Sequence, residues 1–165
     1  MSKCTFPAIL ALLVYCGSTV SGRADDLEIE AATRYMTTDE LFEIYHNRSW
    51  IWSDGAGYFP NKERKFTAYS GSGSNAAFAE GRWFLTWMGK ACFRAIWHGA
   101  DYDAQKLTCF GHRTDGKIIY QRTEPNGEWY VFKSKRAGNT YEIAKFLLGD
   151  YVSAVLNRNR TTLGK

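Results

Sequence analysis

Two cysteines and two histidines in the second half of the sequence are of the right types to bind a metal ion. They are Cys92, His98, Cys109 and His112, and zinc takes sulfur and imidazole nitrogen as ligands in small structural sites. The spacing Cys109-x-x-His112 suits such a site, but five residues separate Cys92 from His98, where compact zinc motifs have about two to four. Because an oxidising compartment favours a disulfide between the cysteines, we expect no metal site and no cofactor.

Acid–base chemistry is a second option, because Asp101 and Asp103 lie close to His98 in the sequence. The same residues would also fit a calcium loop, and a solvated turn explains them most simply. The sequence contains no GxSxG, HExxH or paired-carboxylate motif to supply the nucleophile and base of a hydrolase. We therefore expect a protein that is not an enzyme. An enzyme that uses His98, Asp101 or His112 is the alternative that remains.

Aromatic side chains are the strongest candidates for ligand contacts, since they make up 16% of the chain. Aromatic faces stack on sugars and on apolar ligands, and the mouth of a β-barrel is a common ligand site. The competing interpretation is that most of these rings form the hydrophobic core. The candidate ligand-binding residues are Trp50, Trp52, Tyr58, Trp83, Trp97 and Arg94.

Four arginines alternate into the same segments and would add a polar patch. They are Arg82, Arg94, Arg113 and Arg122, and guanidinium groups bind carboxylates and phosphates well. An anionic glycan or a lipid head group is the kind of ligand that such a patch would contact.

Length and composition are those of one ordinary globular domain, with 165 residues of which 45% are hydrophobic. The formal net charge of +4 is mild, and the charged residues are interspersed along the chain. Nucleic-acid binding requires clustered positive charge, so we expect no nucleic-acid partner.

The first 24 residues have the layout of a secretory signal peptide. Lys3 precedes an apolar run over residues 6–15, and small or polar residues follow up to Ala24. Cleavage after Gly22 or after Ala24 fits the pattern, and we prefer Ala24. Lipidation at Cys16 is the alternative, although no small residue directly precedes that cysteine. The apolar run is too short to span a bilayer, so the sequence predicts a periplasmic or secreted protein that is not integral to a membrane.

Removal of the signal peptide leaves Cys92 and Cys109 as the two remaining cysteines. Two thiols in an exported protein usually pair, so we predict a disulfide between them. If Cys92 lies opposite Cys109 on adjacent strands, Arg94 opposes Leu107 and Ile96 opposes Gln105. The connecting turn then falls at residues 99–103, which also have the composition of a turn.

A helix is predicted over residues 38–46. Thr37 and Glu40 have the spacing of a capping box, and Leu41, Ile44 and Tyr45 follow on one face.

From residue 47 onward, short apolar runs alternate with turn sequences, including Asp115-Gly116 and Asn126-Gly127. About eight short strands of this kind favour a mainly β fold, a small antiparallel β-barrel or sandwich, over a parallel sheet. We expect a single domain over residues 25–157.

The C-terminal region contains a second helical pattern over residues 139–148, ended by Gly149. Residues 150–157 fit either a strand or a helix, and residues 158–165 are predicted to be a basic tail. The domain would then have a short helix near each end.

Several segments together resemble one protein family. They are residues 50–59, 70–73, 79–83, 92–98 and 112–116. The family comprises small exported proteins of alpha-proteobacteria catalogued as domain of unknown function 995, and the likeness extends over residues 38–151. The resemblance implies a periplasmic or cell-envelope setting and no particular activity. The cysteine spacing and the turn after residue 55 are also similar to those of lipocalin-like barrels, which bears on fold alone.

The function that we expect is binding of a small apolar or glycan ligand by an exported, non-enzymatic domain. The alternative is a protein-interaction module that binds an envelope protein, such as an inhibitor of a wall-degrading enzyme. The first would hold its ligand inside the sheet, and the second would bind through exposed loops.

Overall fold

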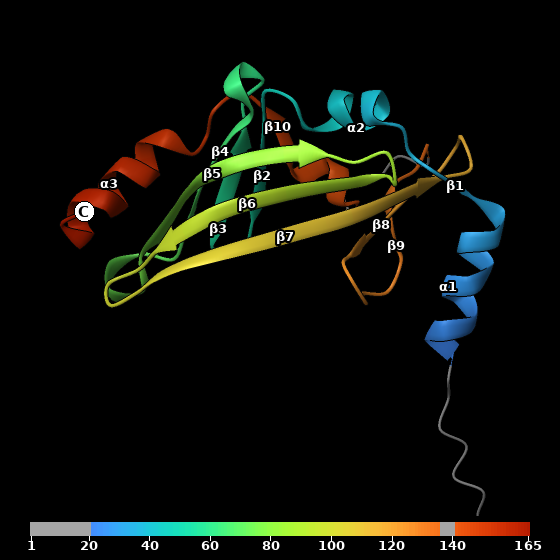
Figure 1. Cartoon of the computed structure of the whole chain (residues 1–165), viewed down its shortest axis with the longest axis horizontal. Helices are drawn as coiled ribbons and strands as arrows, with labels where there is room; N and C mark the ends of the chain where they lie inside the picture. The colour runs from blue at the N-terminus through green and yellow to red at the C-terminus, as the bar shows by residue number, and fades with distance from the viewer. Residues whose placement is uncertain (1–20, 136–140) are drawn as a thin grey trace, which may run out of the picture.

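One antiparallel sheet forms the framework of the protein (Figure 1). The computed structural model describes residues 21–135 and 141–165. In that part of the chain, the strands are β1 (Arg34–Tyr35), β2 (Arg48–Trp52), β3 (Gly55–Phe59), β4 (Lys65–Ser70), β5 (Ala77–Leu85), β6 (Lys90–His98), β7 (Asp103–Thr114), β8 (Ile119–Thr123), β9 (Tyr130–Lys133) and β10 (Phe146–Leu148). The helices are α1 (Ser21–Ala32), α2 (Thr38–Tyr45) and α3 (Ser153–Leu163), with 3-10 turns η1 (Lys62–Arg64), η2 (Gly73–Asn75) and η3 (Glu142–Lys145). The prediction of a mainly β, antiparallel fold with helices near its ends is confirmed.

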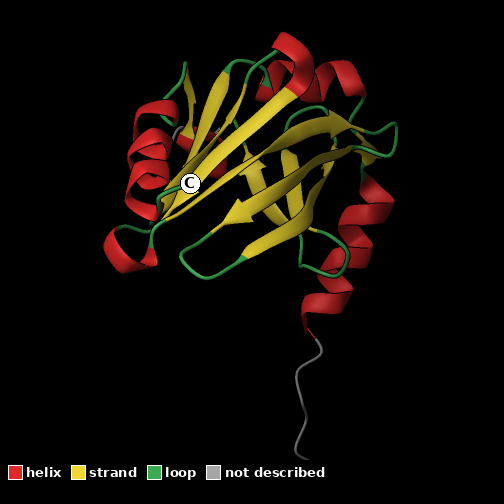
Figure 2. Cartoon of the chain, turned by 60° about the vertical axis from the view of Figure 1, so that its left-hand side comes forward, coloured by secondary structure: helices red, strands yellow, loops and turns green. Residues whose placement is uncertain are grey.

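The sheet curls into a half-barrel (Figure 2). Hydrogen-bonded strands follow the order β10-β2-β3-β4-β5-β6-β7-β8-β9, and β1 adds to β7. Since β9 and β10 are the ends of this order, no backbone ladder joins them within the described residues. Instead, Phe132 of β9 and Phe146 of β10 meet edge to face, with ring centroids 5.5 Å apart. Side chains therefore fill the gap between the two edge strands.

Alternate residues of each strand face the inside of the curl, as the period of a β-strand requires. In β6, Ala91, Phe93 and Ala95 are buried, whereas Arg94 and Ile96, at the alternate positions, are exposed. The inner faces together form the main core, which is rich in aromatic rings. Its fully buried large members are Leu41, Tyr45, Phe59, Trp83 and Phe132.

Helix α2 begins where the capping box predicts. The Thr37 hydroxyl accepts a hydrogen bond from the Glu40 backbone N–H at 3.2 Å, and the Glu40 carboxylate accepts one from the Thr37 N–H at 2.8 Å. These contacts satisfy two of the free donors of the first turn. Leu41, Ile44 and Tyr45 are the buried residues of the helix. They anchor α2 to the core as the sequence predicts.

Helix α3 packs on the outer face of the sheet, over β4 and β5. Val152 and Leu156 are buried against Ala56 and Phe78, and the Asn159 side-chain amide donates to a backbone oxygen of β5 at 3.1 Å. The prediction of a basic tail over residues 158–165 is wrong, because α3 extends to Leu163. Apolar contacts on one side of the helix hold these residues in place.

The predicted helix over residues 139–148 is also wrong. Residues 136–140 lie outside the described part of the chain, η3 is a single 3-10 turn, and Phe146–Leu148 form strand β10. β10 pairs with β2, where Phe146 lies opposite Trp50, and the two rings stack with centroids 4.9 Å apart. Pairing with a strand that is distant in the sequence therefore determines the structure of residues 146–148, although the apolar residues of the whole segment 139–148 have the spacing of a helix.

Most of the predicted signal peptide, residues 1–20, lies outside the described residues. Helix α1 starts at Ser21, and its described contacts with the sheet begin at Asp26. The Asp26 carboxylate accepts from the Trp129 backbone N–H, and the Glu30 carboxylate accepts from Arg122 at 2.8 Å. Over the described residues, no helix is both long and apolar enough to cross a bilayer.

The predicted disulfide is present between Cys92 and Cys109. These residues are direct partners on β6 and β7, and Arg94 opposes Leu107 while Ile96 opposes Gln105, as predicted. The cysteines are 17 residues apart, and closing a loop of that size stabilises a fold by about 3 kcal/mol on the chain-entropy model. The disulfide therefore fixes the register of this hairpin.

A buried polar cluster links α2 to β7 and β8. His112 Nε2 lies 3.2 Å from the Tyr45 hydroxyl and 2.8 Å from the Gln121 amide nitrogen, and the Tyr130 hydroxyl donates to the Gln121 oxygen. His112 is fully buried. Burial disfavours the charged imidazolium and lowers the pKa of His112 to about 4.

This burial makes the stability of the fold dependent on pH. An unfolded histidine takes up a proton near pH 6.5, whereas native His112 does so only near pH 4. The contribution of neutral His112 to the free energy of unfolding is therefore fully present above pH 6.5 and is lost as the pH falls toward 4, by about 3 kcal/mol in all. In urea titrations, the wild type should lose about 2 kcal/mol more between pH 7.5 and 5 than His112→Gln does. An equal pH dependence in His112→Gln and the wild type would contradict this assignment.

Candidate functional site

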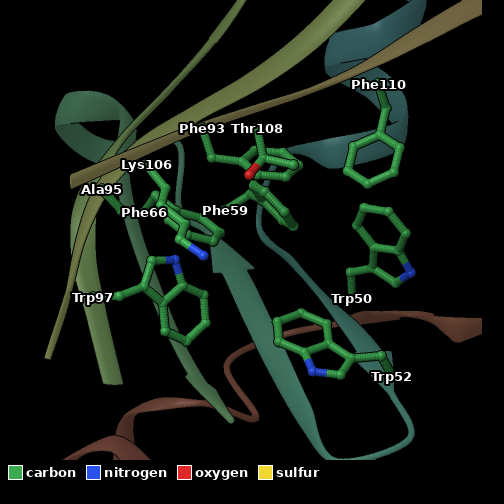
Figure 3. Close-up of a pocket in the computed structure, with 10 residues that line it drawn as sticks. All are labelled: Trp50, Trp52, Phe59, Phe66, Phe93, Ala95, Trp97, Lys106, Thr108 and Phe110. Atoms are coloured by element: carbon green, nitrogen blue, oxygen red, sulfur yellow. The ribbon is translucent and has the colours of Figure 1, made fainter. Parts of the chain in front are cut away.

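A cavity of about 260 Å³ lies inside the curled sheet. Nearly all of its wall is apolar, and rings form most of it (Figure 3). The residues that line it are Trp50, Trp52, Phe59, Phe66, Phe93, Ala95, Trp97, Lys106, Thr108 and Phe110.

The period of the strands explains why these residues converge. Residues spaced by two on a strand share one face of the sheet, and β6 contributes Phe93, Ala95 and Trp97 to the cavity in this way. On β7 the same spacing places residues 106, 108 and 110 there, and on β2 residues 50 and 52. Thr108 lies opposite Phe93, and Lys106 lies opposite Ala95. The β6–β7 hairpin thus forms one continuous wall.

Gly57 on the inner face of β3 makes room for two of the rings. A Cβ atom at this position would lie 2.9 Å from the Phe66 ring and 3.4 Å from the Trp52 ring. The first distance is shorter than a normal carbon–carbon contact. Glycine therefore allows both rings to lie close to the β3 backbone.

The residues that line the cavity differ in how much of each side chain is exposed to solvent. Phe59 is fully buried and Phe66 nearly so, whereas Trp52 and Trp97 are half-buried. Trp50 is held in place because its indole N–H donates to the Glu142 carboxylate at 2.7 Å. The cavity therefore has a buried aromatic floor, and its rim, formed by Trp52 and Trp97, contacts solvent.

Three of the predicted ligand-binding residues meet in this cavity, namely Trp50, Trp52 and Trp97. Trp83 also faces inward, but its indole N–H donates to the Pro60 oxygen at 2.9 Å and its ring packs beside α2. It is a core residue, as the competing interpretation holds.

Tyr58 and Arg94 lie away from the cavity. Both fall between inward-facing neighbours on their strands, so they occupy the outer face of the sheet. Tyr58 packs against the α3 cluster, and Arg94 is exposed opposite Arg82. Because neighbouring residues of a strand face opposite sides of the sheet, Tyr58 points away from the side of Phe59, and Arg94 points away from the side of Ala95.

The sequence analysis did not select the four phenylalanines, Thr108 or Lys106. The predicted register of the hairpin could have identified Thr108 and Lys106. Once Cys92 opposes Cys109, Thr108 must oppose Phe93 and Lys106 must oppose Ala95. Phe59 and Phe66 carry no such signal, because their approach depends on the curl of the sheet.

The candidate acid–base residues do not meet in one cleft. His98 Nδ1 lies 2.9 Å from the Asp103 carboxylate at one end of the β6–β7 hairpin, and Asp101 is exposed in the turn beside them. His112 is buried nine residues further along β7 than Asp103, about 30 Å away for an extended strand. Across the described residues, no group of three or more histidine, cysteine, aspartate or glutamate side chains could hold a metal ion.

Comparison with known proteins gives one result. The sequence model of a family described as "Protein of unknown function (DUF995)" matches residues 11–152. No curated protein and no solved structure matches the chain, so the likeness to lipocalin-like barrels stays a prediction.

The matched region covers the whole of the sheet, including all strands that contribute to the cavity. It also contains both cysteines and every residue of the aromatic wall. The chain therefore belongs to the DUF995 family.

Proposed function

We propose that the protein is a non-enzymatic binding protein that holds a small apolar ligand inside its curled sheet. The observation that carries this proposal is the aromatic cavity of about 260 Å³. Rings that face an open cavity expose apolar surface to water, and a ligand that covers this surface gains about 25 cal/mol for each Å² of apolar area buried. An apolar ligand of matching size would therefore bind favourably.

The lining favours an apolar ligand over a glycan. A sugar requires several hydrogen-bonding partners placed around its ring, because unpaired hydroxyl groups are costly to bury. The inner wall offers few polar groups, and one of them, the Trp50 N–H, is already bonded to Glu142. The volume equals about nine water molecules in the liquid, which suits a ligand of roughly ten non-hydrogen atoms.

An enlarged side chain inside the cavity should block binding. Ala95→Leu adds three carbons to the inner wall, so the affinity for 1-octanol should fall at least about tenfold. Titration of 1-octanol, followed by intrinsic tryptophan fluorescence, measures this change because three tryptophans line the cavity. The matched control Gln105→Leu, on the outer face, should bind like the wild type. Equal affinity of Ala95→Leu and the wild type would show that the ligand binds elsewhere.

We also propose that the protein is exported and that its signal peptide is cleaved after Ala24. The described contacts of α1 with the sheet start at Asp26, so they would survive this cleavage. A disulfide such as Cys92–Cys109 is typical of exported proteins.

Intact-mass spectrometry of protein from the periplasmic fraction tests export directly. The expected mass is that of a chain beginning at Asp25, reduced by about two mass units for the disulfide. A full-length chain recovered from the cytoplasm with two free thiols would contradict the proposal.

The interaction module is the second candidate function, and the surface that would serve it best is the outer face of β5, β6 and β7 rather than the exposed loops that the sequence analysis expects. Arg82 and Arg94 are direct cross-strand partners although like charges repel, and Leu107 lies opposite Arg94 on the next strand. Leu107 is 55% exposed and Ile96 is 45% exposed. This combination of positive charge and apolar surface suits an acidic face of an envelope protein.

An inhibitor of a wall-degrading enzyme would reduce the activity of purified peptidoglycan hydrolases. Under this alternative, the double substitution Arg82→Glu and Arg94→Glu should abolish inhibition, and the cavity variant Ala95→Leu should inhibit like the wild type. Unchanged hydrolase activity in the presence of excess wild-type protein would count against an inhibitor.

A further inference from the structure

All polar side-chain groups of the cavity wall can donate hydrogen bonds. The lining residues carry indole N–H groups, the Lys106 ammonium and the Thr108 hydroxyl, and no carboxylate or amide lines the cavity in the described part of the chain. Indole and ammonium groups donate and cannot accept. A ligand that satisfies them must therefore present acceptor oxygens.

Lys106 occupies an unusual position for a lysine. It faces inward from β7, opposite Ala95 and diagonal to Trp97. Figure 3 shows its side chain reaching into the ring of aromatic residues, with its nitrogen on the side where Trp97 lies. Lys106 is exposed to solvent, so its ammonium group is accessible at the rim.

Several other lysines are paired with carboxylates, and Lys106 is not. Lys65, Lys90 and Lys145 have carboxylate oxygens within 3.0 Å. No ion pair or hydrogen bond of the Lys106 ammonium, or of the Trp97 indole N–H, exists within residues 21–135 and 141–165. The cavity thus combines an apolar interior with an unpaired positive charge and an unpaired donor at its rim.

We propose that the ligand is an amphipathic anion, with an apolar body of about eight carbons and a carboxylate head. This inference rests on the proposed function and specifies the ligand class of the same cavity. The apolar body lies between Trp50, Trp52 and Trp97, and the carboxylate binds the Lys106 ammonium and the Trp97 N–H. Charge-assisted hydrogen bonds of this kind are stronger than neutral ones. A neutral alcohol could accept a hydrogen bond from these donors but would leave the ammonium charge without a counter-charge, and a cationic ligand would be repelled.

Three ligands with the same chain and different heads test the inference: octanoate, 1-octanol and octylamine. Each is titrated at pH 7.5 with tryptophan fluorescence as the readout. We expect octanoate to bind about fivefold more tightly than 1-octanol, because an accessible ion pair contributes modestly, and octylamine to bind most weakly. Raised salt should weaken octanoate binding and leave 1-octanol binding unchanged.

Lys106→Met removes the charge and keeps an apolar side chain of similar length. In this variant, octanoate should lose its advantage over 1-octanol, so the ratio of the two affinities should fall to about one. Lys117→Met, which removes an exposed charge in the β7–β8 turn, is the control and should keep the advantage.

The outcomes separate the two proposals. Equal binding of octanoate and 1-octanol to the wild type, or an octanoate advantage that survives in Lys106→Met, would overturn the anionic head group alone. Failure of all three compounds to bind the wild type would overturn the apolar binding function, and the head-group inference with it.

Discussion

The register between β6 and β7 is the constraint on which the inner surface of this protein depends. The Cys92–Cys109 disulfide joins directly opposed residues of these strands. A shift of one residue would turn every side chain of a strand to the other face of the sheet. Phe93, Ala95 and Trp97 would then point outward, and Arg94 and Ile96 would enter the core. The disulfide therefore protects the composition of the cavity wall as well as the stability of the domain.

Large rings and small residues together produce a space inside the curl. Phe59, Phe66 and Phe93 pack closely, with ring centroids 5.0–5.3 Å apart. The rings of Phe66 and Trp52 occupy the space beside Gly57, whereas Ala95 contributes little volume to the cavity wall. Trp50 does not fill the remaining space, because its indole N–H is bonded to Glu142. The arrangement is therefore typical of a preformed binding site rather than of a uniformly packed core.

Local signals in the sequence were sufficient for the elements that depend on local physics. The capping box predicted α2, and the cysteines together with the turn composition predicted the β6–β7 register. Elements that depend on distant partners were missed. β10 forms because Phe146 pairs with Trp50, far away in the chain, and α3 extends past Arg158 because Leu156 and Asn159 dock on the sheet. The candidate site was predictable to the same extent. The period of a β-strand predicts that Arg94 and Trp97 face opposite sides of the sheet, but it cannot predict how the curl of the sheet brings Phe59 and Phe66 to the cavity.

A crystal structure of the protein with octanoate would test the central claim most directly. The account predicts electron density for the alkyl chain between the rings of Trp50, Trp52 and Trp97, with the carboxylate within hydrogen-bonding distance of Lys106 Nζ. A cavity filled by its own side chains, or octanoate bound only on the outer face beside Arg94, would contradict it.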